Sequence, residues 1–231
     1  DIAMVIPNPR TELNPLVTVG KQIANVARYH LSLPRKEADA MAMAMLNAVQ
    51  IPDPKRRFKA YPHELSGGMA QRVVMAIALI CSPRFIISDD ATSGLDVTVQ
   101  TQVLELLQDL VQKQGASMLF ITRDIGITAH YCHRVAIIYA GEIVEIAETG
   151  SFFDNPQHPY SVMLLSAFSH NPKLRGMWSR PEEGEPSSLS SQGCLFAGRC
   201  VRASETCRKE HPKMRDMQPG HAVRCHHPVV R

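Results

Sequence analysis

Two glycines and a hydroxyl side chain open an apolar helix in residues 65–72, which read LSGGMAQR. The free N–H groups at a helix N-terminus carry partial positive charge and can hold an anion. Glycines let a phosphate approach the backbone closely because they have no Cβ. Ser66, Gly67 and Gly68 are therefore candidate phosphate-contacting residues. A serine N-cap followed by flexible glycines is the simpler interpretation of these three residues taken alone.

Two adjacent carboxylates follow the apolar run at residues 85–88. These are Asp89 and Asp90, and a turn then leads to a third carboxylate, Asp96. The carboxyl ends of parallel strands are where ligands bind in open α/β sheets, and carboxylate oxygens are suitable ligands for Mg²⁺. Taken alone, an Asp-Asp pair is more often a solvated helix start. The pair is therefore a candidate metal-associated group whose interpretation depends on the sequence around it.

Four of the six cysteines gather near the C-terminal end, at Cys194, Cys200, Cys207 and Cys225. The segment that contains them has few large hydrophobic residues, so a bound metal group is the expected source of its stability. Thiolates suit either an iron–sulfur cluster or structural Zn²⁺. The five, six and seventeen intervening residues lack the close C-x-x-C pairs usual for zinc ribbons. The other two cysteines, Cys81 and Cys132, are interpreted as ordinary buried thiols.

Alternating strands and helices must position these groups. Short apolar runs predict buried strands at residues 1–6, 85–88 and 118–122. Helices are expected over residues 16–50, from residue 67 to about residue 80, and over residues 99–114. Strand, helix and strand in succession predict a parallel α/β sheet. Residues 135–139 and 142–146 predict an antiparallel hairpin that closes the edge of this sheet.

The composition changes after residue 150. Residues 152–169 allow one more helix, whereas residues 181–192 are rich in Pro, Glu, Gly and Ser and have too little apolar content to pack. We therefore expect one region over residues 1–150 and a second, with the cysteine cluster, over residues 151–231.

Length and composition restrict the class of protein. The 231 residues, 45% of them hydrophobic, suit one moderate core or two small ones. The net charge of +3 is too weak to argue for a nucleic-acid partner. The longest apolar run, residues 73–81, is far shorter than the roughly 18 to 20 residues that a membrane span needs. The first residues lack the features of a signal peptide, which favours a cytosolic chain with reduced cysteines.

These motifs together resemble the ABC ATPase family. Residues 65–72 are similar to its LSGGQ-like signature, and the flanking residues 61–64 and 73–79 are similar to its peptide-importer branch. Residues 85–96 resemble its Walker B region, which implies that Asp89 is the Mg²⁺-associated carboxylate and Asp96 the D-loop aspartate. The resemblance covers essentially the whole chain. It implies an α/β, P-loop NTPase-type nucleotide-binding domain with a helical subdomain and a small cysteine-rich C-terminal extension.

Three positions depart from the family pattern. Asp90 stands where a glutamate normally polarises the attacking water, and it is one methylene shorter. Arg123 stands where a histidine usually contacts the γ-phosphate, and a guanidinium cannot shuttle a proton. A surface arginine at a strand end is the alternative interpretation. Pro7 stands at the glutamine of the Q-loop and has no side-chain oxygen for Mg²⁺.

The family arrangement implies two different roles for these residues. Two ATPase subunits face head to tail, and each ATP lies between the phosphate loop of one and the signature of the other. Asp89, Asp90 and Arg123 would then be the catalytic residues of this chain's own, impaired site. The residues expected to bind the nucleotide are Ser66, Gly67, Gly68 and Gln71, in the partner's site, and Asp96.

The resemblance also implies partners and cofactors. ATP and Mg²⁺ are expected, together with a second ABC ATPase subunit, identical or different, and two membrane permease subunits. The chain would lie peripherally at the cytoplasmic face of the inner membrane and carry peptides or a related small solute as cargo. The G-x-x-x-x-G-K-S/T phosphate loop of the family is not among these residues and would lie upstream of Asp1. Starting inside a strand favours a fragment over a reduced protein.

The second region resembles the same branch. Residues 155–160, NPQHPY, are similar to a stretch typical of oligopeptide, dipeptide and nickel importer ATPases, although as bare chemistry they are a Pro-flanked turn before a helix. The tail is similar to the C-terminal extension of that branch, which is associated with a 4Fe-4S cluster. This favours an iron–sulfur cluster on the four clustered cysteines. Zinc is the alternative, with His226 or His227 as a reserve ligand.

Three other functions stay open. The first is a fully active, symmetric ATPase that tolerates Asp90 and Arg123. The second is a soluble ABC protein of DNA repair or translation, which works without a permease. The third is a regulatory remnant that binds its partner but never cycles.

Overall fold

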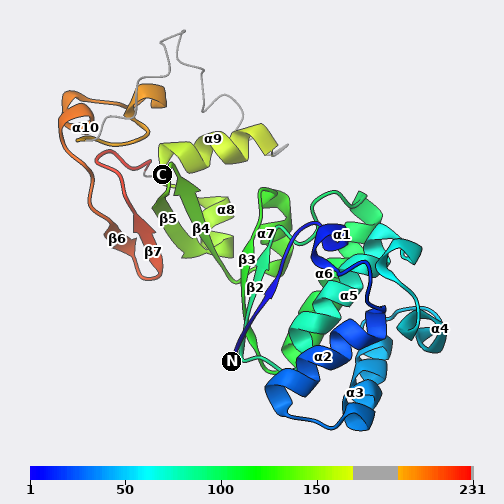
Figure 1. Cartoon of the computed structure of the whole chain (residues 1–231). Coiled ribbons are helices and arrows are strands. Elements are labelled where there is room, and N and C mark those ends of the chain that lie inside the picture. Colours follow the sequence, from blue (N-terminus) through cyan, green and yellow to red (C-terminus); the bar gives the residue numbers. More distant parts are fainter. Residues whose placement is uncertain (169–191, 230–231) are drawn as a thin grey trace. The chain divides into compact units, whose positions relative to one another are not determined.

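The computed structural model describes residues 1–168 and 192–229, in two compact units that divide between Arg123 and Asp124 (Figure 1). The boundary expected at residue 150 rests on composition and stays a prediction. The Pro- and Ser-rich linker expected at residues 181–192 lies outside the described residues except for Gln192.

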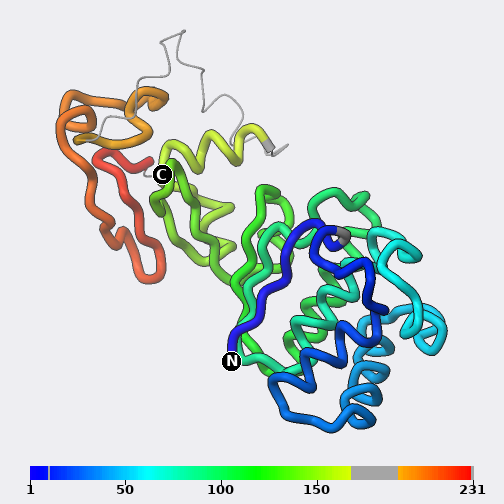
Figure 2. Tube along the Cα trace, viewed as in Figure 1, coloured from blue at the N-terminus to red at the C-terminus, as the bar shows by residue number. Residues whose placement is uncertain are grey.

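The first unit is built on a parallel sheet, as predicted. Its strands lie in the order β1-β2-β3 and are β1 (Ile2–Val5), β2 (Phe85–Asp89) and β3 (Ser117–Ile121). Figure 2 traces how β1 comes to lie beside β2, although the two are far apart in the sequence. The middle strand is buried as expected at Ile86 and Ser88. The flanking strands were expected to be buried too, but apolar side chains such as Met4 and Leu119 are exposed, so they are covered on one face only.

Helices form the rest of this unit. They are α1 (Pro9–Glu12), α2 (Val19–Leu31), α3 (Arg35–Ala48), α4 (Pro54–Phe58), α5 (Gly67–Leu79) and α6 (Val97–Lys113), with a 3-10 turn at Pro62–Glu64. The helical region expected at residues 16–50 is thus a pair of helices. Ser32 takes a left-handed conformation (φ 53°) after α2, and Pro34 precedes α3. Small buried side chains such as Ala27 and Ala42 let the two helices pack closely.

One hydrophobic core joins the helices to the parallel sheet. Helix α5 contacts both β1 and α2, and its side chains Met75 and Leu79 are fully buried. Leu107 of α6 and Ile86 of β2 belong to the same cluster. The signature helix is therefore held rigidly by packing.

The second unit contains an antiparallel sheet in the order β4-β5-β7-β6. Its strands are β4 (Arg134–Tyr139), β5 (Glu142–Glu148), β6 (Arg215–Gln218) and β7 (His221–Val223). The β4–β5 hairpin is confirmed, and both Ala140 (φ 49°) and Gly141 (φ 86°) take the positive φ that a two-residue hairpin turn requires. The expectation that it closes the parallel sheet is wrong, because β5 pairs instead with β7 from the tail.

Short helices complete the described part of the second unit. They are α7 (Ile125–Tyr131), α8 (Thr149–Asp154), α9 (Pro159–Phe168) and α10 (Glu205–Lys209), with a 3-10 turn at Ala197–Arg199. The single helix expected from residue 152 onward is therefore two helices, because Pro156 and Pro159 interrupt it. Val144, Phe152 and Leu165 are buried at its core.

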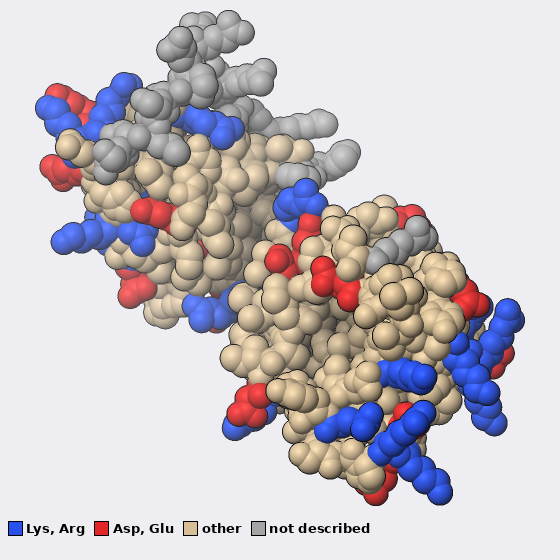
Figure 3. Space-filling model, in the orientation of Figure 1, with Lys and Arg blue, Asp and Glu red and all other residues tan. Residues whose placement is uncertain are grey.

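Charged side chains of both signs are interspersed on the face of the molecule drawn in Figure 3. Within the described ranges, no helix is long and apolar enough to cross a membrane.

Candidate nucleotide-contacting site and cysteine pocket

The signature turn is a capped helix N-terminus. Ser66 has an extended backbone, and its Oγ accepts the N–H of Met69 at 3.3 Å. Helix α5 has no acceptor of its own for the N–H groups of Gly67 and Gly68, because they lie in its first turn. The local geometry therefore agrees with both interpretations of the sequence, an ordinary serine N-cap and a phosphate-contacting turn. A serine cap still leaves the N–H groups of Gly67 and Gly68 free to attract an anion.

The two glycines differ in what surrounds them. A Cβ added to Gly68 would lie 2.7 Å from Cγ1 of Val99 in α6, whereas one added to Gly67 would lie 3.5 Å from Cδ2 of Leu95. Gly68 is thus required for the close approach of α5 and α6. Gly67 has no such packing constraint, so it is the glycine better suited to admit a ligand.

Gln71 lies away from this turn. Its side chain is 1% exposed, and its Nε2 donates to the carbonyl oxygen of Ile6 at 3.3 Å. This bond ties α5 to the end of β1, next to Pro7. Met69, not Gln71, occupies the fifth position of an LSGGQ pattern. A nucleotide contact by Gln71 stays a prediction, and its burial argues for a structural contribution instead.

The two predicted carboxylates stand at the carboxyl end of β2. Asp89 is its last residue, and Asp90 follows with a left-handed backbone (φ 44°), its N–H bonded to the carbonyl oxygen of Ile121 at 2.8 Å. Such a conformation is uncommon outside glycine, although aspartate tolerates it better than most residues. It fixes Asp90 beside the end of β3.

Arg123 engages Asp90 directly. Its Nε and Nη2 donate to Oδ2 of Asp90 at 3.1 and 2.7 Å, and Nη2 also donates to Oγ of Ser93 at 3.1 Å. The arginine side chain is 82% exposed, so the pair contributes little to stability. Its importance is geometric, because it places a cation on the carboxylate that the resemblance assigns to water activation. The sequence indicated both residues but not this contact.

Asp96 has a structural partner as well. Its Oδ1 accepts the N–H of Val99 at 3.0 Å and caps α6. Nε2 of Gln100 donates to Oγ1 of Thr92 at 3.0 Å, which fixes the loop between β2 and α6. The predicted residues of this unit therefore form two neighbouring groups: the acidic edge with Arg123, and the signature turn beside Leu95.

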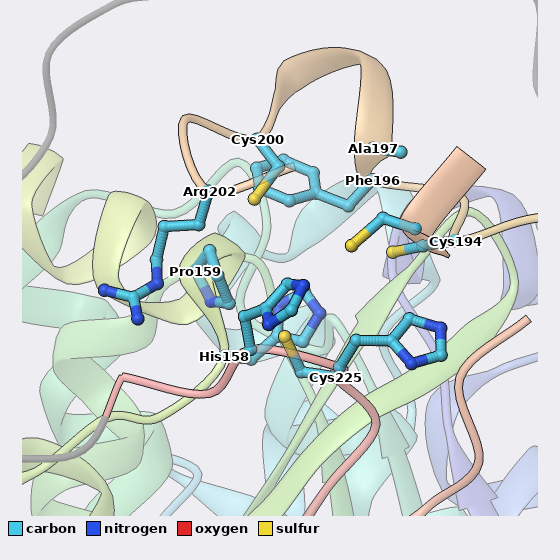
Figure 4. A pocket seen from close by; sticks show the side chains of 11 residues that line it. His158, Pro159, Cys194, Phe196, Ala197, Cys200, Arg202 and Cys225 are labelled. Carbon is cyan, nitrogen blue, oxygen red and sulfur yellow. The ribbon is translucent and has the colours of Figure 1, made fainter. Parts of the chain in front are cut away.

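The four clustered cysteines line one narrow pocket in the second unit (Figure 4). Burial raises the pKa of Cys225 to about 12, and the thiols of Cys200, Cys194 and Cys207 act in the same direction. Among the described residues, however, no three His, Cys, Asp or Glu side chains are placed to hold one metal ion. The four thiols thus gather in one pocket, as the sequence predicted. Which metal group they bind stays a prediction.

A glycine brings two of these cysteines together. A Cβ on Gly193 would lie 2.6 Å from the carbonyl oxygen of Cys207, which accepts the N–H of Cys194 at 2.8 Å. The other two cysteines, Cys81 and Cys132, are half-buried.

The tail has more support than the sequence indicated. Phe196 is 1% exposed and packs against the rings of Tyr139, Tyr160 and His158, with centroids 5.1, 5.5 and 5.8 Å away. Together with the β5–β7 pairing, this contact anchors the tail. The expectation that only the cysteines hold the segment is therefore wrong.

A buried carboxylate also joins the tail to the hairpin. Glu145 is fully buried, and its oxygens accept the backbone N–H groups of Gln157 and His158, both at 2.8 Å. His221 of β7 contacts the same carboxylate through Nε2 at 2.7 Å. These three partners satisfy the buried oxygens of Glu145. No signal in the sequence indicated this network, because its members are far apart along the chain.

Comparison with known proteins identifies the family of two stretches of the chain. Residues 1–93 match the family model described as "ABC transporter", and residues 144–207 match "Oligopeptide/dipeptide transporter, C-terminal region". The "Probable peptide ABC transporter ATP-binding protein y4tR" of Sinorhizobium fredii is 45% identical over 97% of this chain and 68% of its own length. The chain belongs to the peptide-type ABC transporter ATP-binding proteins.

Two other members of this family are the dipeptide transport ATP-binding proteins DppD. The protein from Bacillus subtilis is 41% identical over 97% of this chain and 68% of its own length. The protein from Escherichia coli is 37% identical over 99% of this chain and 70% of its own length.

Solved structures confirm the α/β ABC ATPase fold. A dimeric, post-hydrolysis structure of the ATP-binding cassette MJ0796 bound to ADP and Pi is 25% identical, with a TM-score of 0.55 over 64% of this chain. CbiO1 from Clostridium perfringens, part of the ABC transporter complex cbiONQ, is 22% identical, with a TM-score of 0.59 over 75% of this chain. This ABC ATP-binding chain spans 63% and 65% of those two chains.

Proposed function

We propose that this ABC ATP-binding chain is part of the motor subunit of an importer for peptides or related small solutes. Its relatives are named as peptide and dipeptide transport ATP-binding proteins, which supports this. The match of residues 144–207 to the oligopeptide/dipeptide transporter C-terminal region disfavours a soluble ABC protein of DNA repair or translation. The subunit would bind ATP and Mg²⁺ and work peripherally at the cytoplasmic face of the inner membrane, with a second ATPase subunit and two permease subunits.

The contact between Arg123 and Asp90 carries the more specific proposal that the chain's own site is impaired. One carboxylate oxygen of Asp90 already accepts two N–H groups of a permanent cation. A water molecule would have to displace that cation or use the other oxygen of a side chain that is one methylene too short. Pro7 has no side-chain oxygen to offer Mg²⁺, so the expected site differs from the family pattern at a second position.

The signature turn, in contrast, has the features that a phosphate needs. Ser66 caps the helix, and Gly67 leaves space where a side chain would stand. Such a turn stabilises the negative charge of the γ-phosphate through backbone N–H groups. We propose that it completes the ATP site of the partner subunit, which would then carry most of the hydrolysis.

Steady-state ATP hydrolysis by the full-length subunit with its partner tests this asymmetry. Gly67→Asp would place a carboxylate against the γ-phosphate, and we expect turnover to fall at least about a hundredfold. Gly67→Ala is the matched control, because its Cβ meets only Leu95 at an ordinary contact distance of 3.5 Å. Wild-type turnover in Gly67→Asp would contradict the proposal, because hydrolysis would then not depend on the signature turn of this chain. No turnover in the unaltered pair would favour a remnant that does not cycle.

We also propose that the cysteine pocket holds a 4Fe-4S cluster. The four thiols line one pocket, yet no three of them can reach a single ion as they stand. The four cysteines lack the close C-x-x-C pairs usual for zinc ribbons, which favours the cluster over zinc. When bound, it would supply covalent cross-links between segments of the tail.

Elemental analysis of anaerobically purified, full-length protein tests the ligand. We expect about four iron and four sulfide per chain and a brown colour. One zinc per chain without iron or sulfide would contradict the proposal.

A further inference from the structure

His158 lies on the wall of the cysteine pocket. In the sequence it belongs to a Pro-flanked turn with no evident chemistry, but the folded chain places its ring beside Pro159 and Phe196, facing the hollow that the thiols surround (Figure 4). The residue is 1% exposed. The His158 ring therefore lines the pocket and is shielded from bulk solvent.

Two hydrogen bonds hold His158 in place, one through its backbone and one through its ring. The backbone N–H of His158 donates to Oε2 of Glu145 at 2.8 Å, and Nδ1 accepts the backbone N–H of Tyr160 at 3.0 Å. Because Nδ1 is an acceptor, the proton of the neutral ring is on Nε2. Burial lowers the pKa of His158 to about 4, so the ring is neutral at physiological pH.

The other two histidines of the pocket use their Nε2 atoms elsewhere. Nε2 of His226 contacts the carbonyl oxygen of Glu210 at 2.9 Å, and Nε2 of His227 contacts Oγ of Ser204 at 2.8 Å. Within residues 1–168 and 192–229, the hydrogen bonds of the His158 ring involve Nδ1 alone. Nε2 of His158 is not fully enclosed by protein atoms and opens into the pocket, so a group held there is the expected acceptor of its N–H.

We propose that His158 donates a hydrogen bond from Nε2 to a sulfur atom of the cysteine-held group, and that it is a positioning and tuning residue for that group. The inference rests on the proposed cluster. Hydrogen bonds to the sulfurs of a cluster stabilise added negative charge and so raise its reduction potential. The N–H of His158 is also oriented before any ligand binds, since Glu145 and Tyr160 hold the segment in place.

Redox titration of the full-length, anaerobically reconstituted protein with dithionite tests the proposal. Iron and sulfide are measured first in wild type, His158→Phe and His158→Gln. The phenyl ring keeps the shape without the donor. The glutamine amide restores an N–H near the position of Nε2 and is the matched control.

At the wild-type midpoint potential, we expect the ratio of reduced to oxidised cluster to fall about fivefold in His158→Phe. His158→Gln should stay close to wild type. Equal potentials in wild type and His158→Phe at equal iron content would overturn the inference, as would equal shifts in the Phe and Gln variants. A wild-type protein without iron and sulfide would overturn the proposed cluster itself, which is a different failure.

Pulsed EPR of the reduced wild-type cluster covers the case in which the His158 variants do not assemble. With ¹⁵N-labelled histidine, we expect a coupled exchangeable proton that is lost in D₂O and a histidine nitrogen near the cluster. Absence of both couplings would overturn the inference.

Discussion

At the scale of single residues, the contact between Arg123 and Asp90 decides how the acidic edge works. Each residue alone has an ordinary interpretation: a surface arginine and a solvated aspartate. Their contacts at 2.7 and 3.1 Å convert them into one unit in which the carboxylate already has a cationic partner. Residues that act as a unit are not restored one at a time.

Changes at these two positions should therefore be non-additive. In the proposed arrangement, Gly67→Asp disables the partner's site, so residual ATP hydrolysis would report the chain's own site. In that background, we expect Asp90→Glu alone to change turnover less than about twofold, because Arg123 still holds the carboxylate. Asp90→Glu with Arg123→His should raise it by about tenfold or more, since a titratable base and a full-length carboxylate are then present. A severalfold rise with Asp90→Glu alone would contradict this.

At the scale of elements, the approach of α5 to α6 positions the signature turn beside the loop after β2. This approach depends on Gly68, because a Cβ added there would lie only 2.7 Å from Cγ1 of Val99. Valine is stiff at χ1, so its methyl group cannot rotate away freely. The second signature glycine thus has a packing function as well as its place in a phosphate-binding motif.

Gly68→Ala should accordingly destabilise the protein by about 1–3 kcal/mol through overpacking, measured by urea unfolding. Gly67→Ala should be neutral or slightly stabilising, because its Cβ has room and alanine favours the helix. Adding Val99→Ala to Gly68→Ala removes the clashing methyl and should recover part of the loss. Equal unfolding free energies for the two single alanine variants would argue against the packing function of Gly68.

At the scale of the whole molecule, the chain has two compact units with different means of support. The first has a continuous hydrophobic core from α2 to the parallel sheet. The second combines a small apolar cluster with the Glu145 network, the pairing of β5 with β7, and the cysteine pocket. Loss of the group proposed for the cysteine pocket should therefore act locally.

Cys200→Ser should loosen residues 194–207 and leave the rest folded. We expect amide hydrogen exchange to increase there at least about tenfold, while β7 stays protected through its pairing with β5. Residues 1–123 should exchange as in wild type, because they form a separate compact unit. Increased exchange throughout the first unit would contradict this independence.

Local signals in the sequence determined several secondary-structure elements and motifs of this protein. The LSGG turn with its helix, the apolar strand that ends in Asp89, and the Ala140-Gly141 hairpin are recognisable because their periodicity and turn chemistry lie within a few consecutive residues. The resemblance to the ABC family rests on the same contiguous motifs. The clustering of four cysteines near one end also predicted that they would share a pocket.

Only the tertiary structure decided which distant residues meet. The pairing of Arg123 with Asp90, the burial of Gln71 against Ile6, and the attachment of β5 to β7 each join positions more than thirty residues apart. The same holds for His158, whose ring reaches the cysteine pocket only because the tail folds back over it. Periodicity reports which face of an element is apolar, but it carries no information about which other element covers that face, since apolar burial is not directional.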